Sequence, residues 1–366
     1  MMPSNEFIGQ NKEDLDTPVL LVDLDKFEAN INHLAEFCRT QQTAWRPHSK
    51  AHKCPQIAEL EIQAGALGIT CAKLSEAEVM AEHGVNNILI ANQIVTPNKM
   101  RRLAALQNQA RVITTLDNTA LVEPLGAAAT SCSTLIPVLI DVDIGMNRTG
   151  IGPGLPVLEL ARQICSNPGL EFAGLMGYEG HVLDIQPPAE KIRVCHQALE
   201  QLVQSRDLLQ KNGIPVEIIS AGGTGCYQIT AAYPGITEIQ AGGGIFMDNM
   251  YRSSCNVDDL DFALTVLATV TSRHPGHAVT DAGFKTMSSH EPPTPIGRDD
   301  LELRYLSAEH GVFDIKPGFT GPEIGDQIEF VVGYSDSTNF LHDRFVGVRQ
   351  GTVEKVWDLL GRGKLT

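Results

Sequence analysis

The stretch "RPHSKAHK", which begins at Arg46, gathers four cationic or titratable side chains around Lys50. His48 and His52 flank this lysine on both sides, and Lys53 closes the stretch. A lysine attacks a carbonyl group only as the neutral amine, which neighbouring positive charge or removal from water favours. The stretch therefore predicts either a reactive lysine or a solvated basic surface, and the rest of the chain must decide between them.

Two glycine-rich stretches later in the chain could hold an anion: "SAGGTG" from Ser220 and "QAGGG" from Gln240. Glycine lets backbone N–H groups approach an anion closely, and the hydroxyls of Ser220 and Thr224 add donors. The alternative is that both are tight turns between a strand and a helix. If they face Lys50, they complete what pyridoxal 5'-phosphate (PLP) needs, namely an amine for a Schiff base and a cradle for the phosphate.

Apolar runs of strand length alternate with helical patterns, which predicts an α/β fold, a (β/α)8 TIM-type barrel. The candidate strands start at Ala44, Leu67, Asn87, Arg111, Leu135, Leu170, Val216 and Thr237. Stretches that start at Pro55, Leu74 and Ala189 have amphipathic spacing and close on glycine, as helices do. In the second of these, Ser75 and Glu78 stand at capping-box spacing, which predicts Ser75 as the helix N-cap.

The pattern changes after Tyr251 to short alternating runs typical of a mostly antiparallel β domain. These runs start at Phe262, His277, Leu301, Asp326 and Arg344. An extra strand, "TPVLLVDL", precedes the barrel and could complete the second sheet. The predicted domains are therefore a barrel over residues 25–251 and a β domain made of residues 1–24 and 252–366.

In a barrel of this kind, the C-terminal ends of the strands carry the chemistry. The side chains that the strand order brings to that end are His48, Lys50, His52, Asp141, Asp143, Arg148, Tyr178 and His181. The two glycine-rich stretches follow the seventh and eighth strands, where barrels often bind phosphate. The order of the strands thus favours the reactive-lysine interpretation of "RPHSKAHK".

The composition narrows the classes of function. The chain has 366 residues, 43% of them hydrophobic and 20% charged, which is ordinary for a globular protein of two domains. Its net charge of −16 argues against nucleic-acid and anionic-membrane partners. The N-terminal stretch lacks the pattern of a signal peptide, and the eight cysteines are scattered, so a reducing, cytoplasmic location is expected.

Seven motifs carry a family resemblance, in the order "RPHSKAHK", "DVDIGMNRTG", "GYEGH", "SAGGTG", "TEIQAGGGIFMD", "DAGFK" and "LSAEHG". With them the chain resembles, over nearly its whole length, the D-threonine aldolase and D-serine dehydratase group of alanine-racemase-like, fold-type III PLP enzymes. The resemblance implies that Lys50 forms the Schiff base and that Arg148 contacts the phenolate oxygen of the cofactor. It also implies a homodimer.

The resemblance assigns further residues around the cofactor. His48 belongs to the lysine motif, and the phosphate-binding region matches Ser220, Gly223, Thr224, Gly242 and Gly243. Either Tyr178 or Gln240 meets the pyridine nitrogen. The candidates for acid–base or other catalytic roles are His52, Tyr178, His181, His310 and Tyr334, and Asp281 could line the site. His52 could instead orient Lys50 or simply pack.

The group that the chain resembles uses a divalent metal ion (Mn, Mg or Zn), held by a His-x-Asp or His-x-Cys pair, to bind the substrate's β-hydroxyl. The aldolase pattern GHCDPTVNLYD corresponds here to "GYSDSTNFLHD", residues 333–343. Asp336 matches the pair, but Tyr334 replaces the histidine, and tyrosine, with a pKa of about 10, is a poor ligand at neutral pH. His342 could contribute only if the loop folds back. A metal ion on Asp336 is therefore left open.

The favoured hypothesis is a PLP-dependent lyase that splits D-3-hydroxy amino acids into glycine, or a related amino acid, and an aldehyde. The alternatives are a dehydratase of the D-serine or 3-hydroxyaspartate type and a metal-independent amino acid racemase or epimerase, which the replacement at Tyr334 favours. A non-catalytic PLP carrier is disfavoured, because such barrels lack the second domain. The expected partners are a small amino acid substrate and a second copy of the chain.

Overall fold

The computed structural model describes residues 7–366 and divides into two compact units. The barrel unit contains Leu34–Gly242 and Gly363–Thr366. The second unit contains residues 7–33 and Gly243–Arg362. The first six residues of the predicted β domain lie outside the described range.

The barrel unit is built on an eight-stranded parallel sheet with the order β2-β9-β8-β7-β6-β5-β4-β3. An isolated parallel bridge between His48 and Thr70 links the chain after β2 to β3 and completes the ring. The strands are β2 (Ala44–Trp45), β3 (Ile69–Cys71), β4 (Asn87–Gln93), β5 (Arg111–Leu116), β6 (Ile136–Asp141), β7 (Leu170–Met176), β8 (Ile218–Ala221) and β9 (Glu238–Ile239). Each lies in a predicted stretch, so the (β/α)8 prediction is confirmed.

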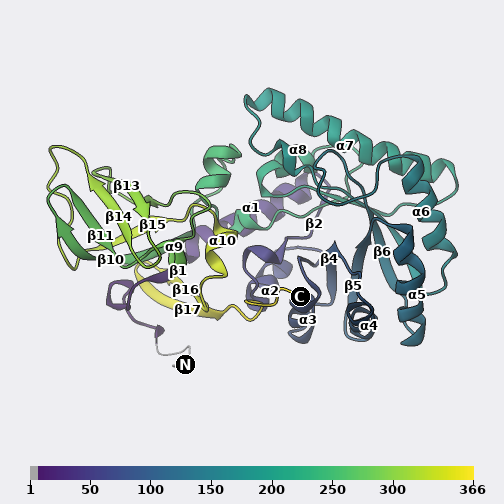
Figure 1. Ribbon diagram of the computed structural model, residues 1–366, viewed down its shortest axis with the longest axis horizontal. Helices are drawn as coiled ribbons and strands as arrows, with labels where there is room; N and C mark the ends of the chain where they lie inside the picture. The colour runs from purple at the N-terminus through teal and green to yellow at the C-terminus, as the bar shows by residue number, and fades with distance from the viewer. Residues whose placement is uncertain (1–6) are drawn as a thin grey trace. The chain divides into compact units, whose positions relative to one another are not determined.

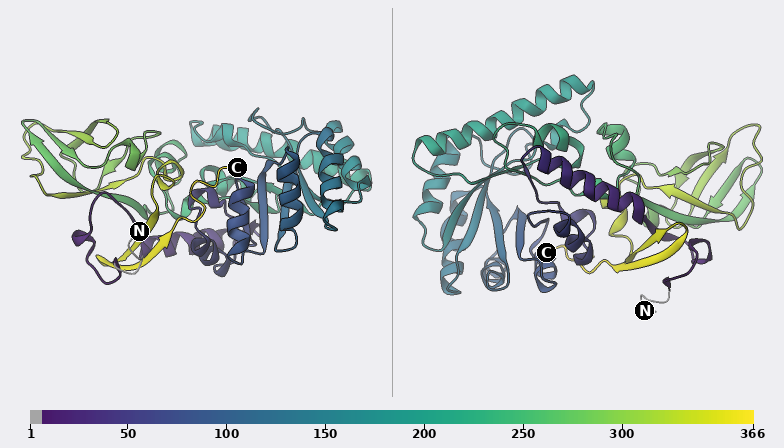
Figure 2. Two further views of the ribbon diagram at one scale, coloured as in Figure 1. Left: turned by 60° about the horizontal axis from the view of Figure 1, so that its bottom comes forward. Right: turned by 180° about the vertical axis from the view of Figure 1, so that it is seen from behind.

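Helices alternate with these strands, and Figure 1 shows α3, α4 and α5 following one another around the outside of β4, β5 and β6. The helices are α1 (Leu24–Thr40), α2 (Pro55–Gln63), α3 (Leu74–Glu82), α4 (Pro97–Leu106), α5 (Val122–Ser131), α6 (Leu155–Ser166), α7 (Pro188–Lys211) and α8 (Tyr227–Ala231). Gly65, Gly84 and Gly213 follow α2, α3 and α7 with positive φ, as predicted for helix C-termini. Figure 2 shows the long α7 from two further sides.

The predicted N-cap at Ser75 is wrong. Helix α3 begins at Leu74, and Ser75 is buried in its first turn. The backbone N–H of Ser75 donates to the carbonyl oxygen of Thr366 at 2.9 Å, and its hydroxyl accepts from the Thr366 N–H at 3.2 Å. The C-terminal residue of the chain thus takes the place of a local cap, a partner that the local sequence pattern does not reveal.

The barrel core follows from strands that are buried on both faces. All six residues of β6 are buried, as expected for a central parallel strand covered by helices. One apolar cluster runs across four neighbouring strands and contains Leu89, Ile113, Leu139, Ala173 and Met176. This packing holds the strand ends, and the loops that follow them, in fixed positions.

The second unit contains a nine-stranded sheet with the main path β13-β14-β11-β10-β1-β16-β17. Its strands are β1 (Val19–Asp23), β10 (Leu264–His274), β11 (His277–Thr280), β12 (Thr294–Pro295), β13 (Leu301–Leu306), β14 (Gly311–Ile315), β15 (Gln327–Val331), β16 (Arg344–Arg349) and β17 (Thr352–Asp358), with the short helices α9 (Phe284–Met287) and α10 (Ser335–Asn339). Strand β1 pairs antiparallel with β10 and parallel with β16. The other named pairings of this sheet are antiparallel, so the predicted mostly antiparallel β domain is confirmed.

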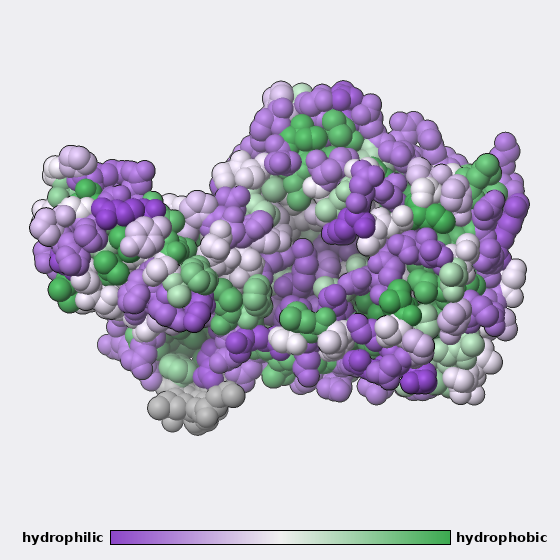
Figure 3. Space-filling model, viewed as in Figure 1, coloured by the Kyte–Doolittle hydropathy of each residue, from purple (hydrophilic) through white to green (hydrophobic). Residues whose placement is uncertain are grey.

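The face shown in Figure 3 carries polar side chains around smaller apolar patches. Among residues 7–366, no helix combines the length and the hydrophobicity that crossing a bilayer requires.

Candidate active site

Lys50 lies in a single 3-10 turn, Ser49–Ala51, which is separated from the end of β2 by residues 46–48. Ser49 and Ala51 are fully buried, whereas Lys50 is exposed. Because all eight barrel strands are parallel, their C-terminal ends share one end of the barrel. Lys50 therefore lies at the same end as the loops that follow β6, β7, β8 and β9.

A buried carboxylate, Glu76 of α3, holds the Lys50 turn from both sides. Its Oε1 accepts from the Ser49 hydroxyl at 2.6 Å, and its Oε2 pairs with the Lys53 ammonium at 2.8 Å. The side chain of Glu76 is fully buried. Because Ser49 and Lys53 bracket Lys50 in the chain, this one carboxylate fixes the backbone that presents the amine.

The cations that surround Lys50 in the sequence are compensated in the structure. Arg46 is 1% exposed and binds Glu238 of β9, with Nε–Oε1 and Nη2–Oε2 distances of 3.0 Å. Lys53 is paired with Glu76, as described above. Neither cation therefore supplies the uncompensated charge beside Lys50 that the sequence suggested.

The two histidines of the motif have different environments. His48 Nδ1 accepts the backbone N–H of Lys50 at 3.4 Å. Burial, followed by the positive charges of Lys50 and Lys53, holds the pKa of His48 well below its usual range, so the ring is neutral. His52 is fully buried, with Nδ1 bonded to the Cys54 N–H at 3.0 Å and Nε2 3.3 Å from Glu61 of α2. Burial raises the pKa of Glu61. His52 is thus hydrogen-bonded through Nδ1, while its Nε2 lies near Glu61 without forming a hydrogen bond among the described residues.

Arg148 and Tyr178 come together from the loops after β6 and β7. The guanidinium carbon of Arg148 lies 5.4 Å from the centre of the Tyr178 ring, within cation–π range. The same ring packs on the first glycine loop, because a Cβ added to Gly223 would lie 3.3 Å from Tyr178 Cε2. Tyr178 thus links the Arg148 loop to the loop after β8.

The aspartates after β6 shape the loop that carries Arg148. Asp143 Oδ1 accepts the N–H groups of Gly145 and Asn147, each at 3.0 Å. Asp141 accepts from the Thr149 hydroxyl at 2.8 Å, and burial raises its pKa. Both carboxylates are therefore engaged in loop structure.

His181 lies against the same loop, since a Cβ on Gly145 would lie 2.9 Å from its Nε2. Its Nδ1 is buried, and none of the described residues offers it a hydrogen-bond partner.

The first glycine loop is held from behind by two buried charges. Glu179, which follows Tyr178 directly, accepts the Gly222 N–H and the Cys226 thiol, both at 3.2 Å. The Lys191 ammonium of α7 donates to the Gly225 carbonyl at 2.7 Å and is itself 4% exposed. Gly222 has φ +74°, which favours glycine. The backbone of this loop is therefore preorganised.

The second glycine loop lies directly against the Lys50 turn. A Cβ on Gly242 would overlap the backbone carbonyl oxygen of His48, so only glycine permits this approach. The Gln240 amide donates to the Ser220 hydroxyl at 2.9 Å and ties the second loop to the end of β8. Lys50 and both glycine loops thus form one contiguous structure.

This donor set fits PLP. It offers the exposed Lys50, the Arg148 guanidinium, the hydroxyls of Ser220 and Thr224, and two glycine loops. In the second loop, a side chain at Gly242 would collide with backbone. An amine suits the aldehyde, and backbone N–H groups with hydroxyls suit a phosphate. A guanidinium suits an anionic ring oxygen.

Two of the predicted second-unit residues, Tyr334 and Asp336, lie at the start of α10. Tyr334, which precedes the helix, donates its hydroxyl to Asp336 Oδ2 at 2.8 Å. Asp248 is fully buried and accepts the backbone N–H groups of Ser335 at 2.8 Å and Tyr251 at 2.9 Å. Burial, together with the nearby charge of Asp336, raises the pKa of Asp248 to about 7.

The other second-unit candidates lie elsewhere. His310 is exposed in the turn between β13 and β14. Asp281 accepts the Thr17 hydroxyl at 2.6 Å, which ties the chain before β1 to the sheet. His342 is turned to the Thr286 carbonyl at 2.9 Å, and burial lowers its pKa.

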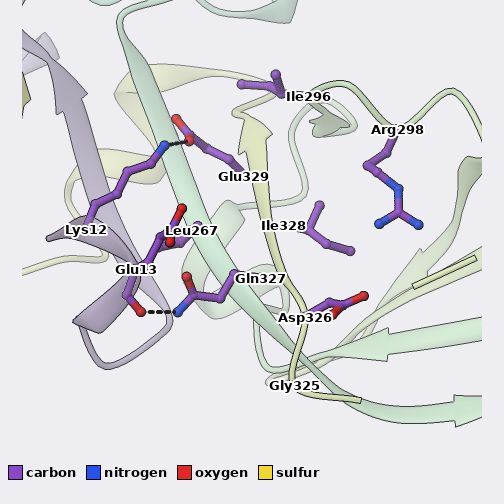
Figure 4. A pocket seen from close by; sticks show the side chains of 10 residues that line it. All are labelled: Lys12, Glu13, Leu267, Ile296, Arg298, Gly325, Asp326, Gln327, Ile328 and Glu329. Atoms are coloured by element: carbon purple, nitrogen blue, oxygen red, sulfur yellow. Dashed lines mark hydrogen bonds and ion pairs between the residues drawn. The ribbon is translucent and has the colours of Figure 1, made fainter. Parts of the chain in front are cut away.

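A hollow of about 590 Å³ in the second unit is a separate feature (Figure 4). Its lining consists of Lys12, Glu13, Leu267, Ile296, Arg298, Gly325, Asp326, Gln327, Ile328 and Glu329. A Lys12–Glu329 ion pair of 2.5 Å lies in it, and none of the predicted site residues lines it.

Sequence reasoning missed the residues behind the site: Glu61, Glu76, Glu179 and Lys191. A buried carboxylate looks the same in sequence as a solvated one on a helix surface. Only Glu179 carried a local signal, because it stands inside the motif "GYEGH".

Comparison with known proteins identifies the class to which this fold and lysine site belong. The family model described as alanine racemase, N-terminal domain, matches residues 22–250, and a serine dehydratase domain matches residues 263–348. The chain belongs to the alanine-racemase-like family of fold-type III PLP enzymes.

Individual relatives narrow the position of the chain within that family. The chain is 37% identical to a D-threonine aldolase of an Arthrobacter species, over 95% of this chain and 93% of the relative. It is 32% identical to a 3-hydroxy-D-aspartate aldolase of Paracoccus denitrificans strain Pd 1222, over 97% and 94%. The crystal structure of D-threonine aldolase from Filomicrobium marinum superposes with a TM-score of 0.95 at 34% identity, over 98% of this chain and 99% of that one. The predicted resemblance is confirmed.

Proposed function

We propose that this protein is a PLP-dependent lyase that cleaves the Cα–Cβ bond of D-3-hydroxy amino acids, giving glycine or a related amino acid and an aldehyde. The observation that carries the proposal is the exposed Lys50 amine on a rigid turn packed against the Gly242 loop. The relatives named D-threonine aldolase and 3-hydroxy-D-aspartate aldolase support the choice of reaction and substrate class.

The chemistry that PLP supplies when bound is electron withdrawal from Cα of an amino acid, which weakens the bonds to that carbon. In this chain Lys50 would be the covalent anchor, and Glu76 orients it through Ser49 and Lys53. The N–H groups of the glycine loops after β8 and β9, with Ser220 and Thr224, would hold the phosphate.

Arg148 would bond the ring oxygen, and the Tyr178 ring supports its guanidinium. Tyr178 and Gln240 are the two candidates for the pyridine nitrogen, although the Gln240 amide is already turned to Ser220. His181 is the barrel residue best suited to move a proton, because its buried Nδ1 has no hydrogen-bond partner among the described residues. We assign His52 a positioning role beside Glu61.

Dehydration of the same substrates is the second candidate, favoured by the serine dehydratase domain match over residues 263–348. One experiment separates the two. Purified holoenzyme is incubated with D-threonine, D-3-hydroxyaspartate or D-serine, with L-threonine as a control, and the products are identified by chromatography. Glycine with an aldehyde supports the lyase. Ammonia with a keto acid shows the dehydratase, and an inverted isomer shows a racemase or epimerase.

We also propose a homodimer in a reducing, cytoplasmic environment. Phe284, Phe319 and Phe340 of the second unit are 42%, 57% and 48% exposed, as expected for side chains that a second copy covers. All eight cysteines are free thiols. Light scattering coupled to gel filtration tests the dimer, and a monomer at micromolar concentration would contradict it.

A further inference from the structure

We propose that Tyr334 and Asp336 form a metal-free hydrogen-bonded pair where the aldolase pattern has a metal-ligand pair, so that this protein works without a divalent metal ion. The claim about catalysis rests on the proposed lyase function, but the claim about metal binding does not. It concerns the second unit alone.

The hydrogen bond between Tyr334 and Asp336 shows where the phenol proton lies. Tyr334 Oη lies 2.8 Å from Asp336 Oδ2, with the phenol donating to the carboxylate. A phenol that donates in this way is neutral, whereas a tyrosine that ligates a metal ion must lose its proton, which in water requires a pH of about 10. The proton that the two side chains share is therefore one that a metal ion would have to displace.

Two neighbouring rings hold the Tyr334 phenol in this orientation. The Tyr334 ring lies edge-on to Tyr251, with 6.0 Å between the ring centres, and 5.1 Å from the His290 ring. Tyr251 is in turn fixed by the bond from its N–H to Asp248. The Tyr334–Asp336 contact is thus part of a packed structure rather than a chance rotamer on an open surface.

Two nearby side chains that could act as ligands, Asp248 and His342, are engaged elsewhere. Asp248 uses its two oxygens for the N–H groups of Tyr251 and Ser335, and His342 Nε2 is bonded to the Thr286 carbonyl. These residues do not fit the metal site that the family resemblance implies.

The consequence for chemistry follows from the donor types. A phenol and a carboxylate can hydrogen-bond a hydroxyl group, but they do not polarise it as a divalent cation does. We therefore expect turnover that is unchanged, within about twofold, by EDTA or by added Mn²⁺.

The test restores the missing ligand. Wild-type protein and the variant Tyr334→His are exchanged into Mn²⁺ or Zn²⁺, dialysed, and analysed for metal content by mass spectrometry. Wild type should retain far less than one ion per chain, and Mn²⁺ should leave its Tm unchanged. Tyr334→His should retain about one ion per chain and gain a few degrees in Tm when the metal is in large excess over its Kd. A stoichiometric metal in dialysed wild type overturns the proposal, and so does a folded Tyr334→His that binds no more metal than wild type.

Two further variants make the result specific. Tyr334→Phe removes only the hydroxyl and should bind no metal. That result would show that the imidazole in Tyr334→His creates the metal site, and not the loss of the Tyr334–Asp336 bond. The double variant Tyr334→His with Asp336→Ala should lose the gained metal, and retention there would place the ion elsewhere and overturn the proposal. If no substrate is turned over at all, the lyase proposal fails, but the metal content still tests the proposal that Tyr334 and Asp336 bind no metal ion.

Discussion

The Lys50 turn in the barrel and the Tyr334 segment in the second unit are built alike. Lys50 lies within a short helical turn that follows extended backbone, and Tyr334 is the extended residue directly before such a turn. Behind each lies a fully buried carboxylate that uses both of its oxygens: Glu76 bonds the Ser49 and Lys53 side chains in the barrel, and Asp248 bonds backbone N–H groups in the second unit.

A glycine supports each segment from another side. A Cβ on Gly242 would overlap the His48 carbonyl oxygen, and a Cβ on Gly333, directly before Tyr334, would overlap the Glu291 carbonyl oxygen. In both places a second stretch of backbone approaches closer than any side chain would allow. The two segments therefore share one way of holding a functional side chain still.

The difference lies in how the buried charge is balanced. Glu76 faces a cation, Lys53, whereas both oxygens of Asp248 meet backbone N–H groups and Asp336 lies nearby. The barrel turn is therefore electrically balanced, and the pKa of Asp248 rises to about 7. The barrel segment thus keeps Lys50 on a support in which Glu76 is paired with a cation. The Tyr334 segment, which departs from the family pattern, instead rests on Asp248, a carboxylate without a cationic partner among the described residues.

Lys50→Ala should give the largest effect, because it removes the functional side chain and leaves its support intact. We expect the absorbance of bound PLP to disappear and turnover to fall at least about 10³-fold. The free energy of unfolding of the protein without cofactor should change by less than about 0.5 kcal/mol, since the side chain is exposed. Absorption spectra and urea unfolding check both points. Full PLP absorbance in the variant would show that another lysine carries the cofactor.

The fold was predictable because its signals are local and repeated. The barrel strands lie in runs of strand length between helical patterns, three of which (α2, α3 and α7) close on glycine, and the N-terminal strand is an apolar run placed before the barrel. Strand β14 was missed, because "GVFDI" is short and starts at the last residue of the motif "AEHG", so it resembles the end of a loop. The cap at Ser75 was predicted wrongly, because its real partner, Thr366, is the last residue of the chain.

The site was predictable only as far as its exposed residues. Lys50, Arg148 and the glycine loops carry motifs, and the topology brings them to one end of the barrel. The buried support Glu76 carries no signal in the sequence, and Glu179 is marked only by its motif, because the function of both depends on partners between 23 and 51 residues away. The pairing of Arg46 with Glu238 was equally hidden, and it removed a cation that the sequence suggested was near Lys50.

Glu76→Gln should break the charge balance of the barrel segment. The amide can still bond Ser49, but Lys53, with a side chain 10% exposed, is left as a buried charge without its partner. We expect a loss of about 3–5 kcal/mol in the free energy of unfolding, measured in urea, together with weaker retention of PLP in dialysis.

Glu78→Gln on the same helix is the matched control. Its partner is Arg102, and the two side chains are 27% and 32% exposed, so the loss should stay below about 1 kcal/mol with PLP retained. Equal losses for the two variants would show that the Glu76 network does not support the lysine turn.

Asp248→Asn should expose the pH sensitivity of the second segment. A carboxyl group whose pKa is raised on folding keeps a proton that the unfolded chain has lost, so it stabilises the fold below its usual pKa of 3.8 and loses that contribution as pH rises to about 7. The free energy of unfolding of wild type should therefore fall by at most about 1.4 kcal/mol per pH unit in this window and then level off. The asparagine variant should show a shallower fall, measured by urea unfolding from about pH 5 to about pH 8. Parallel curves for the two proteins would mean that Asp248 titrates normally.

Gly242→Ala should give the smallest effect and sharpens the comparison most. The added methyl group must push the His48 carbonyl and the Lys50 turn away from the second glycine loop, at a loss of about 1–3 kcal/mol. Because this moves the Lys50 amine relative to the phosphate loop, PLP should be retained less well than in wild type.

Gly333→Ala makes the same intrusion before Tyr334, so it should lose similar stability but retain PLP normally. Gly152→Ala, where a Cβ meets nothing within 4 Å, should change neither property. If Gly333→Ala released PLP as readily as Gly242→Ala, the two segments would not be independent supports, and cofactor retention would depend on both.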